Sequence, residues 1–228
     1  MGSKDQYQEI FEEHHNPLIA QYPAGDAAQN AWSSPASQRV RFERLVEVIP
    51  VEAMSDSVVL DVGCGTGELA RYLQELGFAG TYYGIDFNER MIEVANSYTK
   101  PLLPNPDAAS FSFMKISQFE AAHGPVDYVL ASGIFALLFT SANDIDANYH
   151  GIVTGTIEVM FRLARRALAF NLLSTHAMVL APRMAYVPPP YAIYGFIEPF
   201  TKFFNLLHDY RDNDMTIQMF HDQQGART

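Results

Sequence analysis

Cysteine and charged residues are scarce in this sequence. Cys64 is the only cysteine among 228 residues, which excludes an internal disulfide framework and fits a reducing compartment. Charged side chains make up 18% of the chain, and 26 acidic residues outnumber 15 basic ones, giving a net charge of −11. Because an anionic surface repels phosphate backbones, we expect no nucleic-acid partner.

Long apolar runs are also absent. No stretch reaches the roughly 18–20 continuous apolar residues that a membrane helix needs, and the first residues lack the basic and apolar regions of a secretory signal. We therefore expect a cytoplasmic protein with no membrane partner, present as a monomer or a homodimer. Hydrophobic residues still make up 48% of the chain. This excludes disorder and predicts one domain over residues 1–228 with a sizeable core.

Strand and helix patterns alternate along the chain, as judged from the spacing of apolar residues. The predicted strands are 57–62, 81–86, 110–116, 126–132 and 167–173, followed by a hairpin of 208–211 and 215–220. The predicted helices are 37–49 with Ser37 as its cap, 68–76, one that begins after Asn88, 145–166 and 198–207. This alternation predicts an α/β fold with a doubly wound, mostly parallel sheet. Residues 1–36 are expected to form an N-terminal arm or cap.

A glycine-rich loop follows the first predicted strand. Gly63, Gly65 and Gly67 let the backbone turn tightly and approach a ligand closely, and their G-x-G-x-G spacing differs from that of dinucleotide binders. Asp86 ends the second strand, where a carboxylate is suited to accept both ribose hydroxyls of a nucleoside. Asp61, beside the loop, is poorly placed for a pyrophosphate but suits an ammonium group. The set indicates S-adenosylmethionine, a nucleoside with a cationic amino-acid tail.

Several motifs carry a family resemblance. The segment 60–67, Leu-Asp-Val-Gly-Cys-Gly-Thr-Gly, and the segment 83–86, Tyr-Gly-Ile-Asp, match two motifs of class I (seven-strand) S-adenosylmethionine-dependent methyltransferases. Segments 32–39, 127–135, 169–175 and 208–210 extend the resemblance to a bacterial subgroup of small-molecule type. The resemblance covers most of the chain from about Trp32 onward. It implies a Rossmann-like, seven-stranded sheet, and S-adenosyl-L-homocysteine as the product of the cofactor.

The resemblance also implies a role for particular residues near the glycine loop. Asp61 holds the ammonium group, Asp86 binds the ribose, and the three glycines line the methionyl part with Cys64 between them. Phe87 and Met91 flank the adenine. Asp86 also suits a helix cap, and Cys64 is interpreted as a small buried spacer because no histidine is near it in sequence.

Further implied cofactor contacts lie elsewhere in the chain. Ser117 and Gln118 are candidates for the adenine edge, and Ser132 and Gly133 are expected to face the sulfonium. The arm is expected to close the site, with an arginine or amide on the methionyl carboxylate; the candidates are Trp32, Gln38 and Arg41. Two alternatives stay open, since Trp32 also suits packing and Arg41 also suits a surface pair with Glu43 or Glu47.

Methyl transfer from a sulfonium is an in-line displacement, so alignment of the acceptor is the protein's main task. A general base helps only an acceptor that must lose a proton. Candidates are His176 after the fifth strand, His150 after the fourth strand, and His15 and Tyr22 in the arm. A structural role is an open alternative for each. No metal site is expected, because the paired histidines at 14 and 15 do not face the same way on a helix.

The loop insertion at 174–197 is expected on the substrate side. The surrounding segment 171–200 holds only two charged residues, Arg183 and Glu198, and long loops at such edges are usually functional. Its apolar content predicts a small acceptor with apolar or aromatic surface, methylated on oxygen or nitrogen. Alternatively the loop packs on the sheet or on a second subunit. Rival functions are a non-catalytic cofactor-binding module or partner subunit, a protein or RNA methyltransferase, and a nicotinamide oxidoreductase.

Overall fold

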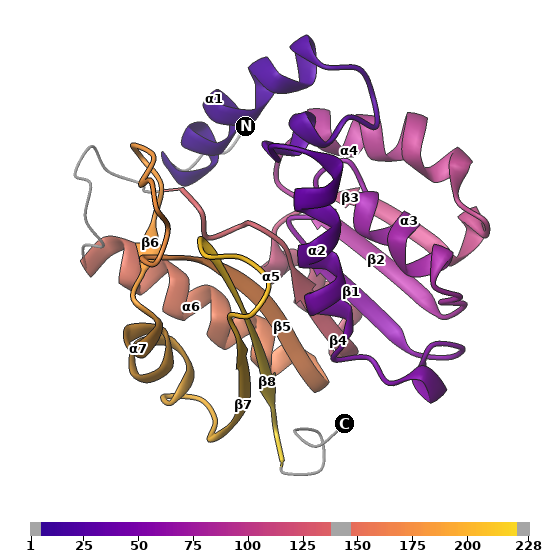
Figure 1. The fold of residues 1–228 in the computed structure, drawn as a ribbon. Coiled ribbons are helices and arrows are strands. Elements are labelled where there is room, and N and C mark those ends of the chain that lie inside the picture. The colour runs from indigo at the N-terminus through magenta and orange to yellow at the C-terminus, as the bar shows by residue number, and fades with distance from the viewer. Residues whose placement is uncertain (1–5, 138–146, 223–228) are drawn as a thin grey trace.

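The computed structural model describes residues 6–137 and 147–222, which fold around one twisted sheet (Figure 1). Its strand order is β3-β2-β1-β4-β5-β8-β7, with β6 paired to β5 outside this path. The strands are β1 (Val58–Val62), β2 (Thr81–Asp86), β3 (Ala109–Phe113), β4 (Val126–Ala131), β5 (Ala164–Ser174), β6 (Tyr186–Val187), β7 (Phe203–Leu207) and β8 (Asp214–Phe220). β8 runs antiparallel to both of its neighbours, β5 and β7, and the other strand pairs of this sheet are parallel. The predicted doubly wound α/β fold is therefore confirmed.

Helices cover both faces of the sheet. They are α1 (Gln6–Gln21), α2 (Pro35–Val46), α3 (Glu68–Glu75), α4 (Glu89–Val94), α5 (Ile116–His123), α6 (Ala147–Leu163) and the single turn α7 (Pro189–Tyr191). Short 3₁₀ and π segments are Ala27–Asn30, Val51–Ala53, Ala95–Thr99, Lys100–Leu102, Pro106–Ala108 and Ala192–Ile197.

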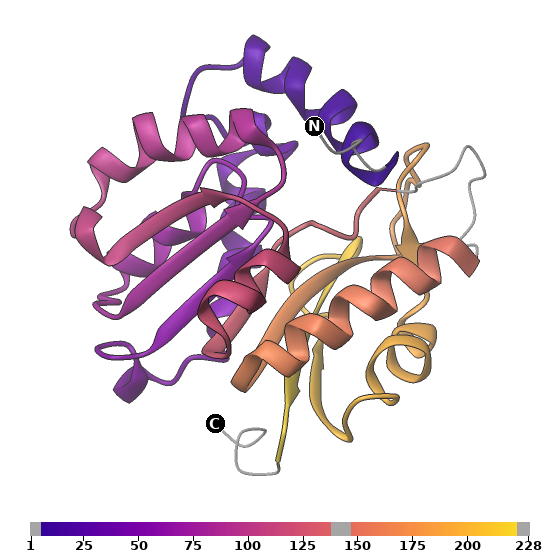
Figure 2. The same ribbon diagram turned by 180° about the vertical axis from the view of Figure 1, so that it is seen from behind.

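The two faces have separate apolar cores. One core joins α2, α3 and α4 to the sheet through side chains such as Leu45, Leu69 and Ile92. The other joins α5, α6 and the segment 192–197, which Figure 2 shows on the opposite face. Burial of both faces explains why the central strands β1, β4 and β5 are mostly apolar. Within the described ranges, no helix is both long and apolar enough to cross a membrane.

Two sequence predictions about the C-terminal region are wrong. Residues 203–207 form β7 rather than the end of a helix, because Phe203 to Leu207 pair in register with Phe220 to Thr216 of β8. The hairpin's first arm is therefore 203–207, and residues 208–213 form its connection. A short apolar run fits a strand and a helix equally well until a pairing partner decides.

The cap of α2 also differs from the prediction. Ser34, not Ser37, is the N-cap, and its hydroxyl accepts the backbone N–H of Ser37 at 3.1 Å. Pro35 occupies the first turn, where its missing N–H costs nothing. The helix ends at Val46, three residues before the predicted end.

Replacing Ser34 with alanine is expected to lower the free energy of unfolding by about 1 kcal/mol, because loss of the capping hydroxyl leaves a backbone donor unpaired. Urea denaturation of the variant measures this loss. Ser55→Ala, at an exposed position, is the control and is expected to unfold like the parent. Equal midpoints for both variants would contradict the assignment of the cap.

Candidate active site

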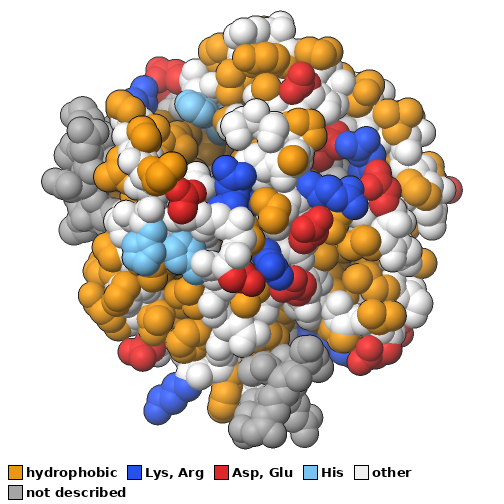
Figure 3. Space-filling view, in the orientation of Figure 1, with side chains coloured by type: hydrophobic (Ala, Val, Ile, Leu, Met, Phe, Trp, Pro, Cys, Tyr) orange, Lys and Arg blue, Asp and Glu red, His pale blue; other side chains and the backbone are white. Residues whose placement is uncertain are grey.

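A cavity of about 480 Å³ opens at the edge where β1, β2, β4 and β5 end and β8 begins. The arm closes it from above, since α1 runs across this edge of the sheet in Figure 1. Figure 3 shows the hollow bordered by apolar side chains, with histidine and basic side chains at its rim. Of the predicted site residues, those that line the cavity are His15, Trp32, Gln38, Arg41, Asp61, Gly63, Cys64, Gly65, Asp86, Phe87, Met91, Ser132 and Gly133. The position follows the rule for parallel sheets, in which ligands bind at the carboxyl ends of the strands.

The glycine loop needs glycine for its shape and for its contact with the arm. Gly65 has φ +54°, and a side chain there would place Cβ 2.1 Å from Oδ1 of Asn30. That oxygen accepts the backbone N–H of Thr66 at 3.1 Å, and Nδ2 of Asn30 donates to Oγ1 of Thr66 at 2.7 Å. The 3₁₀ turn 27–30 of the arm is therefore fixed to the loop. Cys64 is buried and protonated, because burial raises the pKa of its thiol.

Asp61 is a buried carboxylate, and only one of its two oxygens has a hydrogen-bond partner among the described residues. Its Oδ2 accepts a hydrogen bond from the hydroxyl of Tyr82. Its Oδ1 has no hydrogen-bond partner among the described residues, and the residue lines the cavity. Burial raises the pKa of this carboxyl to about 7, even though the Tyr82 hydrogen bond lowers it. A buried acceptor that lacks a partner favours binding of a cation with N–H donors.

Asp86 combines a structural role with a place in the cavity. Its Oδ2 accepts the backbone N–H of Gly65 at 3.0 Å, and its Oδ1 accepts that of Asn88 at 2.8 Å. Burial raises its pKa to about 6 against these two hydrogen bonds. Asn88 caps α4 as predicted, through the N–H of Arg90. Each carboxylate oxygen has a second lone pair, so the same group can also accept hydroxyls.

Three predicted cofactor contacts do not line the cavity. Ser117 and Gln118 lie exposed at the start of α5, where Oε1 of Gln118 accepts the backbone N–H of Lys115 at 2.7 Å. Gly67 is buried against Phe111, whose ring would lie 2.8 Å from an added Cβ. Gly67 therefore serves the packing of the loop, and contact of Ser117 and Gln118 with a ligand stays a prediction.

The end of β4 meets the arm and β5. Gly133 has φ +78°, and an added Cβ would lie 3.0 Å from the ring of Trp32. Its N–H donates to Oδ1 of Asn171 at 2.7 Å. The hydroxyl of Ser132 and Nδ2 of Asn171 are buried and lack partners among the described residues. Polar atoms that could bind a ligand thus gather at this wall.

Arg41 points inward from α2 instead of pairing on the surface. Its guanidinium makes an ion pair with Asp214, with Nε and Nη2 each 2.6 Å from Oδ2. Its Nη1 donates to the backbone oxygen of Ser37 at 2.6 Å, and its charge lies 4.6 Å from the ring of Trp32. The alternative pairing of Arg41 with Glu43 or Glu47 is wrong. Those carboxylates pair with the other arginines of this helix region, Arg39 and Arg44.

Only one of the four predicted base candidates lines the cavity, namely His15. His150 lies outside it, stacked on Phe196 with Nδ1 2.9 Å from the hydroxyl of Tyr191. His176 is exposed beside His208, with ring centroids 5.0 Å apart. Tyr22 does not line the cavity either.

His15 is held in its neutral form. Nδ1 lies 3.0 Å from the backbone oxygen of Phe11, so it carries the proton, and Nε2 keeps its lone pair. Burial, with a smaller contribution from the neighbouring His14, lowers the pKa of this imidazole to about 4, although the hydrogen bond to Phe11 opposes the fall. The Phe11 ring beneath it packs edge-on against Phe87 at 5.4 Å. His15 is therefore a neutral hydrogen-bond acceptor in the arm.

The loop insertion supplies the apolar wall. Ala181, Pro182, Met184 and Tyr186 line the cavity, and Met184 forms a bridge with Leu137 of the loop after β4. The same segment packs on the sheet through β6. The loop therefore lines the cavity and packs on the sheet at once, and its contact with an acceptor stays a prediction.

The polar cavity residues that sequence reasoning missed include Asn30, Asn171, Arg211 and Asp214. Asn171 is an amide inside the otherwise apolar run 167–173 of β5, and that contrast was the available signal. The other three lie in a 3₁₀ turn, in a loop and at a strand end, and only the fold brings them to the cavity.

The chain matches known proteins along most of its length. Residues 53–178 match the family model described as methyltransferase domain. Rv1506c of Mycobacterium tuberculosis, assigned to the methyltransferases, is 28% identical over 169 residues, which are 73% of this chain and 95% of that protein. The 2-phytyl-1,4-naphtoquinone methyltransferase of Nostoc punctiforme is 33% identical over 35% of this chain and 34% of its own.

A solved structure shares the fold. Magnesium protoporphyrin IX methyltransferase from Synechocystis, crystallised with S-adenosylmethionine, superposes with a TM-score of 0.66 at 15% identity, covering 96% of this chain and 98% of its own. The CcbJ methyltransferase of Streptomyces caelestis has a TM-score of 0.58 at 13% identity, over 86% of this chain and 97% of its own. The chain therefore belongs to the methyltransferase domain family and has the fold of the S-adenosylmethionine-dependent enzymes.

Proposed function

We propose that this protein transfers the methyl group of S-adenosylmethionine to an oxygen or nitrogen atom of a small, partly apolar organic acceptor. The observation that carries the proposal is Oδ1 of Asp61, which is buried without a hydrogen-bond partner among the described residues, in a side chain that lines the cavity beside the glycine loop. An unpaired buried carboxylate oxygen costs free energy unless a cationic donor binds it. The ammonium group of the cofactor is such a donor.

The cavity residues fit the other parts of this cofactor. Asp86 has acceptor capacity for the ribose, and Phe87 and Met91 supply apolar surface for the adenine. Gly63 and Gly65 leave the backbone bare for the methionyl part. Asp214 and Ser37 engage most of the N–H donors of Arg41, so we assign the methionyl carboxylate to the amide of Gln38, which lines the cavity.

The bound cofactor supplies a methyl group activated by its sulfonium, so the protein needs only to align an acceptor and keep water out. The wall opposite the glycine loop is suited to this task. Leu137, Pro182 and Met184 are apolar and lie on the side where β4 and β5 end. His15 lies in the helix that covers the cavity, where its Nε2 can accept a hydrogen bond from an acceptor hydroxyl.

Calorimetric titration of the protein with S-adenosylhomocysteine, and separately with NAD, tests the cofactor assignment. We expect binding of S-adenosylhomocysteine only. Binding of NAD alone would favour an oxidoreductase. Transfer of tritiated methyl from S-adenosylmethionine into the small-molecule fraction of an extract then tests turnover. Label in protein or RNA would contradict a small acceptor, and cofactor binding without transfer would indicate a binding module.

Replacing His15 with alanine is expected to lower kcat for a hydroxyl acceptor by about 10²-fold, the lower end of general-base contributions. Because the pKa of His15 is about 4, the imidazole is neutral above that value. The kcat at saturating cofactor should therefore not fall through loss of this base between pH 7.5 and 5.5. Initial rates across this range, with exposed His123→Ala as control, check the prediction. An unchanged kcat in the His15 variant would leave alignment as the only contribution.

A further inference from the structure

The charged side chains of the cavity are separated by sign. Asp61 and Asp86 lie at the ends of β1 and β2, whereas Arg41 and Arg211 lie beside Asp214 at the start of β8. In the sheet order, β8 is three strands from β1, or roughly 14 Å at the usual strand spacing. The acidic end suits a cationic cofactor. The basic end needs an anion of a different origin.

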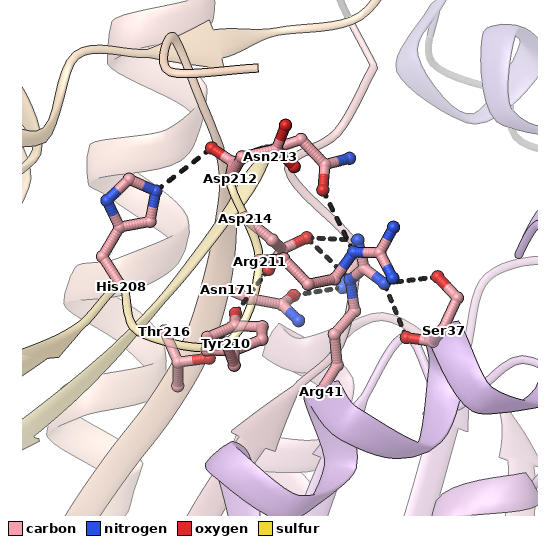
Figure 4. Close-up of polar contacts among 11 residues, drawn as sticks. Ser37, Arg41, Asn171, His208, Tyr210, Arg211, Asp212, Asn213, Asp214 and Thr216 are labelled. Atoms are coloured by element: carbon pink, nitrogen blue, oxygen red, sulfur yellow. Dashed lines mark hydrogen bonds and ion pairs between the residues drawn. The ribbon is translucent and has the colours of Figure 1, made fainter. Parts of the chain in front are cut away.

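Arg211 is a positively charged side chain with few hydrogen-bond partners among the described residues. Its Nε donates to Oδ1 of Asn213 at 3.1 Å, and within the described residues no ion pair joins it to a carboxylate. Figure 4 shows Arg41 reaching from α2 and Arg211 from the loop before β8 toward the same side of Asp214. Burial raises the pKa of Asp214, and the charges of both guanidinium groups oppose this rise. Two positive charges thus share one negative charge, and a positive charge remains at the cavity wall.

The single carboxylate of this cluster is already engaged. Oδ2 of Asp214 accepts both contacts from Arg41, and its Oδ1 accepts the hydroxyl of Tyr210 at 2.6 Å. Arg211 is half-buried and lines the cavity. Most of its N–H donors therefore remain available to a ligand. A planar guanidinium with such donors matches a carboxylate through two parallel hydrogen bonds.

A second observation at the same wall indicates an anion or acceptor group. Asn171 is 3% exposed, and its Oδ1 is fixed by the N–H of Gly133. Its Nδ2 is a buried donor without a partner in the described part of the chain, and Asn171 lines the cavity. Leu172 and Leu173, which follow it, line the cavity too. A ligand that brings hydrogen-bond acceptors to this wall would satisfy that donor.

Apolar surface continues from this basic end toward the loop insertion. Pro182 and Met184 line the cavity together with Leu137. We propose that the methyl acceptor is an amphipathic organic acid, whose carboxylate binds Arg211 and whose apolar body packs on these side chains. This inference rests on the proposed function, because it identifies the class of acceptor for that site.

A rival is that Arg211 holds the cofactor's own carboxylate. The positions argue against this rival. Gln38, to which we assign the cofactor's carboxylate, lines the cavity from α2, the helix that also carries Arg41. Arg211 belongs to the connection into β8, beside β5. The two assignments give opposite results in the following experiment.

Trp32 makes the site directly measurable. It is the only tryptophan of the chain, and it lines the cavity against Arg41. Its fluorescence is titrated in protein saturated with S-adenosylhomocysteine, using phenylacetate, 3-phenylpropanoate and cyclohexanecarboxylate, each beside its neutral primary amide. We expect the acids to bind at least tenfold more tightly than their amides. In Arg211→Gln the preference should fall below twofold, and in Arg211→Lys much of it should remain.

The control variant is Arg165→Gln, an exposed arginine at the opposite end of β5, which should keep the full preference. Calorimetry should give the same Kd for S-adenosylhomocysteine, within twofold, in all variants. Equal binding of acids and amides, no measurable acid binding, or a preference that survives in Arg211→Gln would each overturn the proposal. A tenfold loss of S-adenosylhomocysteine affinity in Arg211→Gln would overturn it in favour of the rival.

Failure of the proposed function would give a different pattern. In that case the parent protein itself would not bind S-adenosylhomocysteine. The acid and amide titrations are therefore repeated without it, so that the anion site is decided independently. Circular dichroism melting of each variant confirms that a loss of binding reflects the site and not the fold.

Discussion

Replacing Arg41 with methionine is expected to lower the free energy of unfolding by about 3–5 kcal/mol. The side chains of Arg41 and Asp214 are each 3% exposed, and the guanidinium also binds the backbone of Ser37. Without Arg41, Asp214 becomes a buried carboxylate that keeps the hydrogen bond from Tyr210 and the more distant charge of Arg211 but has no ion pair among the described residues. Removing one partner of a buried pair costs more than the pair contributes, because the other charge stays desolvated.

Urea denaturation at pH 7 measures the loss. Arg162→Met is the matched control, because Arg162 forms an exposed ion pair with Glu120, and exposed pairs contribute little. The double variant Arg41→Met with Asp214→Leu should recover part of the stability, since no unpaired charge is left. Equal destabilisation by Arg41→Met and Arg162→Met would contradict a structural role for the buried pair.

The loss should also depend on pH, with a definite sign. Burial raises the pKa of Asp214, and Arg41 lowers it. Removing Arg41 therefore raises this pKa further, so the carboxyl of the variant takes up a proton more readily as pH falls. A neutral carboxyl needs no counter-charge. The variant should consequently be less destabilised, relative to the parent, at pH 5 than at pH 8.

Local signals explain which parts of the site could be predicted from the sequence. A buried strand, a glycine turn and a capped helix are contiguous in the chain, so the places of Asp61, Gly65 and Asp86 followed directly. The cap Asn88 was predictable for the same reason. Arg41 was also predicted at the site, but its ion pair was not, because its partner Asp214 is 173 residues away and meets it only through the pairing of β5 with β8. Spacing on a helix offered only surface pairs as the alternative.

The histidines show the same limit. His150 follows β4 and His176 follows β5, as expected for the substrate side, yet neither lines the cavity. His150 contacts Tyr191 and Phe196 instead. These two residues belong to the segment 189–197, whose single turn and π-helix have no clear periodicity. His15 reaches the cavity because α1 lies across the edge of the sheet. Loop and arm packing decides such positions, and periodicity carries no information about it.

Asp61→Asn is expected to weaken binding of S-adenosylhomocysteine at pH 8 by about 10- to 100-fold, because it removes a charged hydrogen-bond acceptor while keeping its shape. The fold should change little, since the amide oxygen can still accept from Tyr82. Calorimetry measures the change, and melting of the ligand-free variant serves as the control. An unchanged Kd would mean that the ammonium group binds elsewhere, and the proposed function would lose its main support.

The pH dependence of S-adenosylhomocysteine affinity shows whether the charge of Asp61, and not only an uncharged hydrogen bond, contributes to binding. The pKa of Asp61 is about 7 in the ligand-free protein, and a bound ammonium group favours the ionised form. Affinity should therefore fall by about tenfold between pH 8 and pH 6 as the carboxyl becomes protonated. Asp86, with a pKa of about 6, adds about a further twofold loss by pH 6.

In Asp61→Asn only this second, smaller dependence should remain. In Tyr82→Phe the hydrogen bond that lowers the pKa of Asp61 is lost, so the fall should begin at higher pH. A profile that is identical in all three proteins would show that Asp61 does not bind the cation.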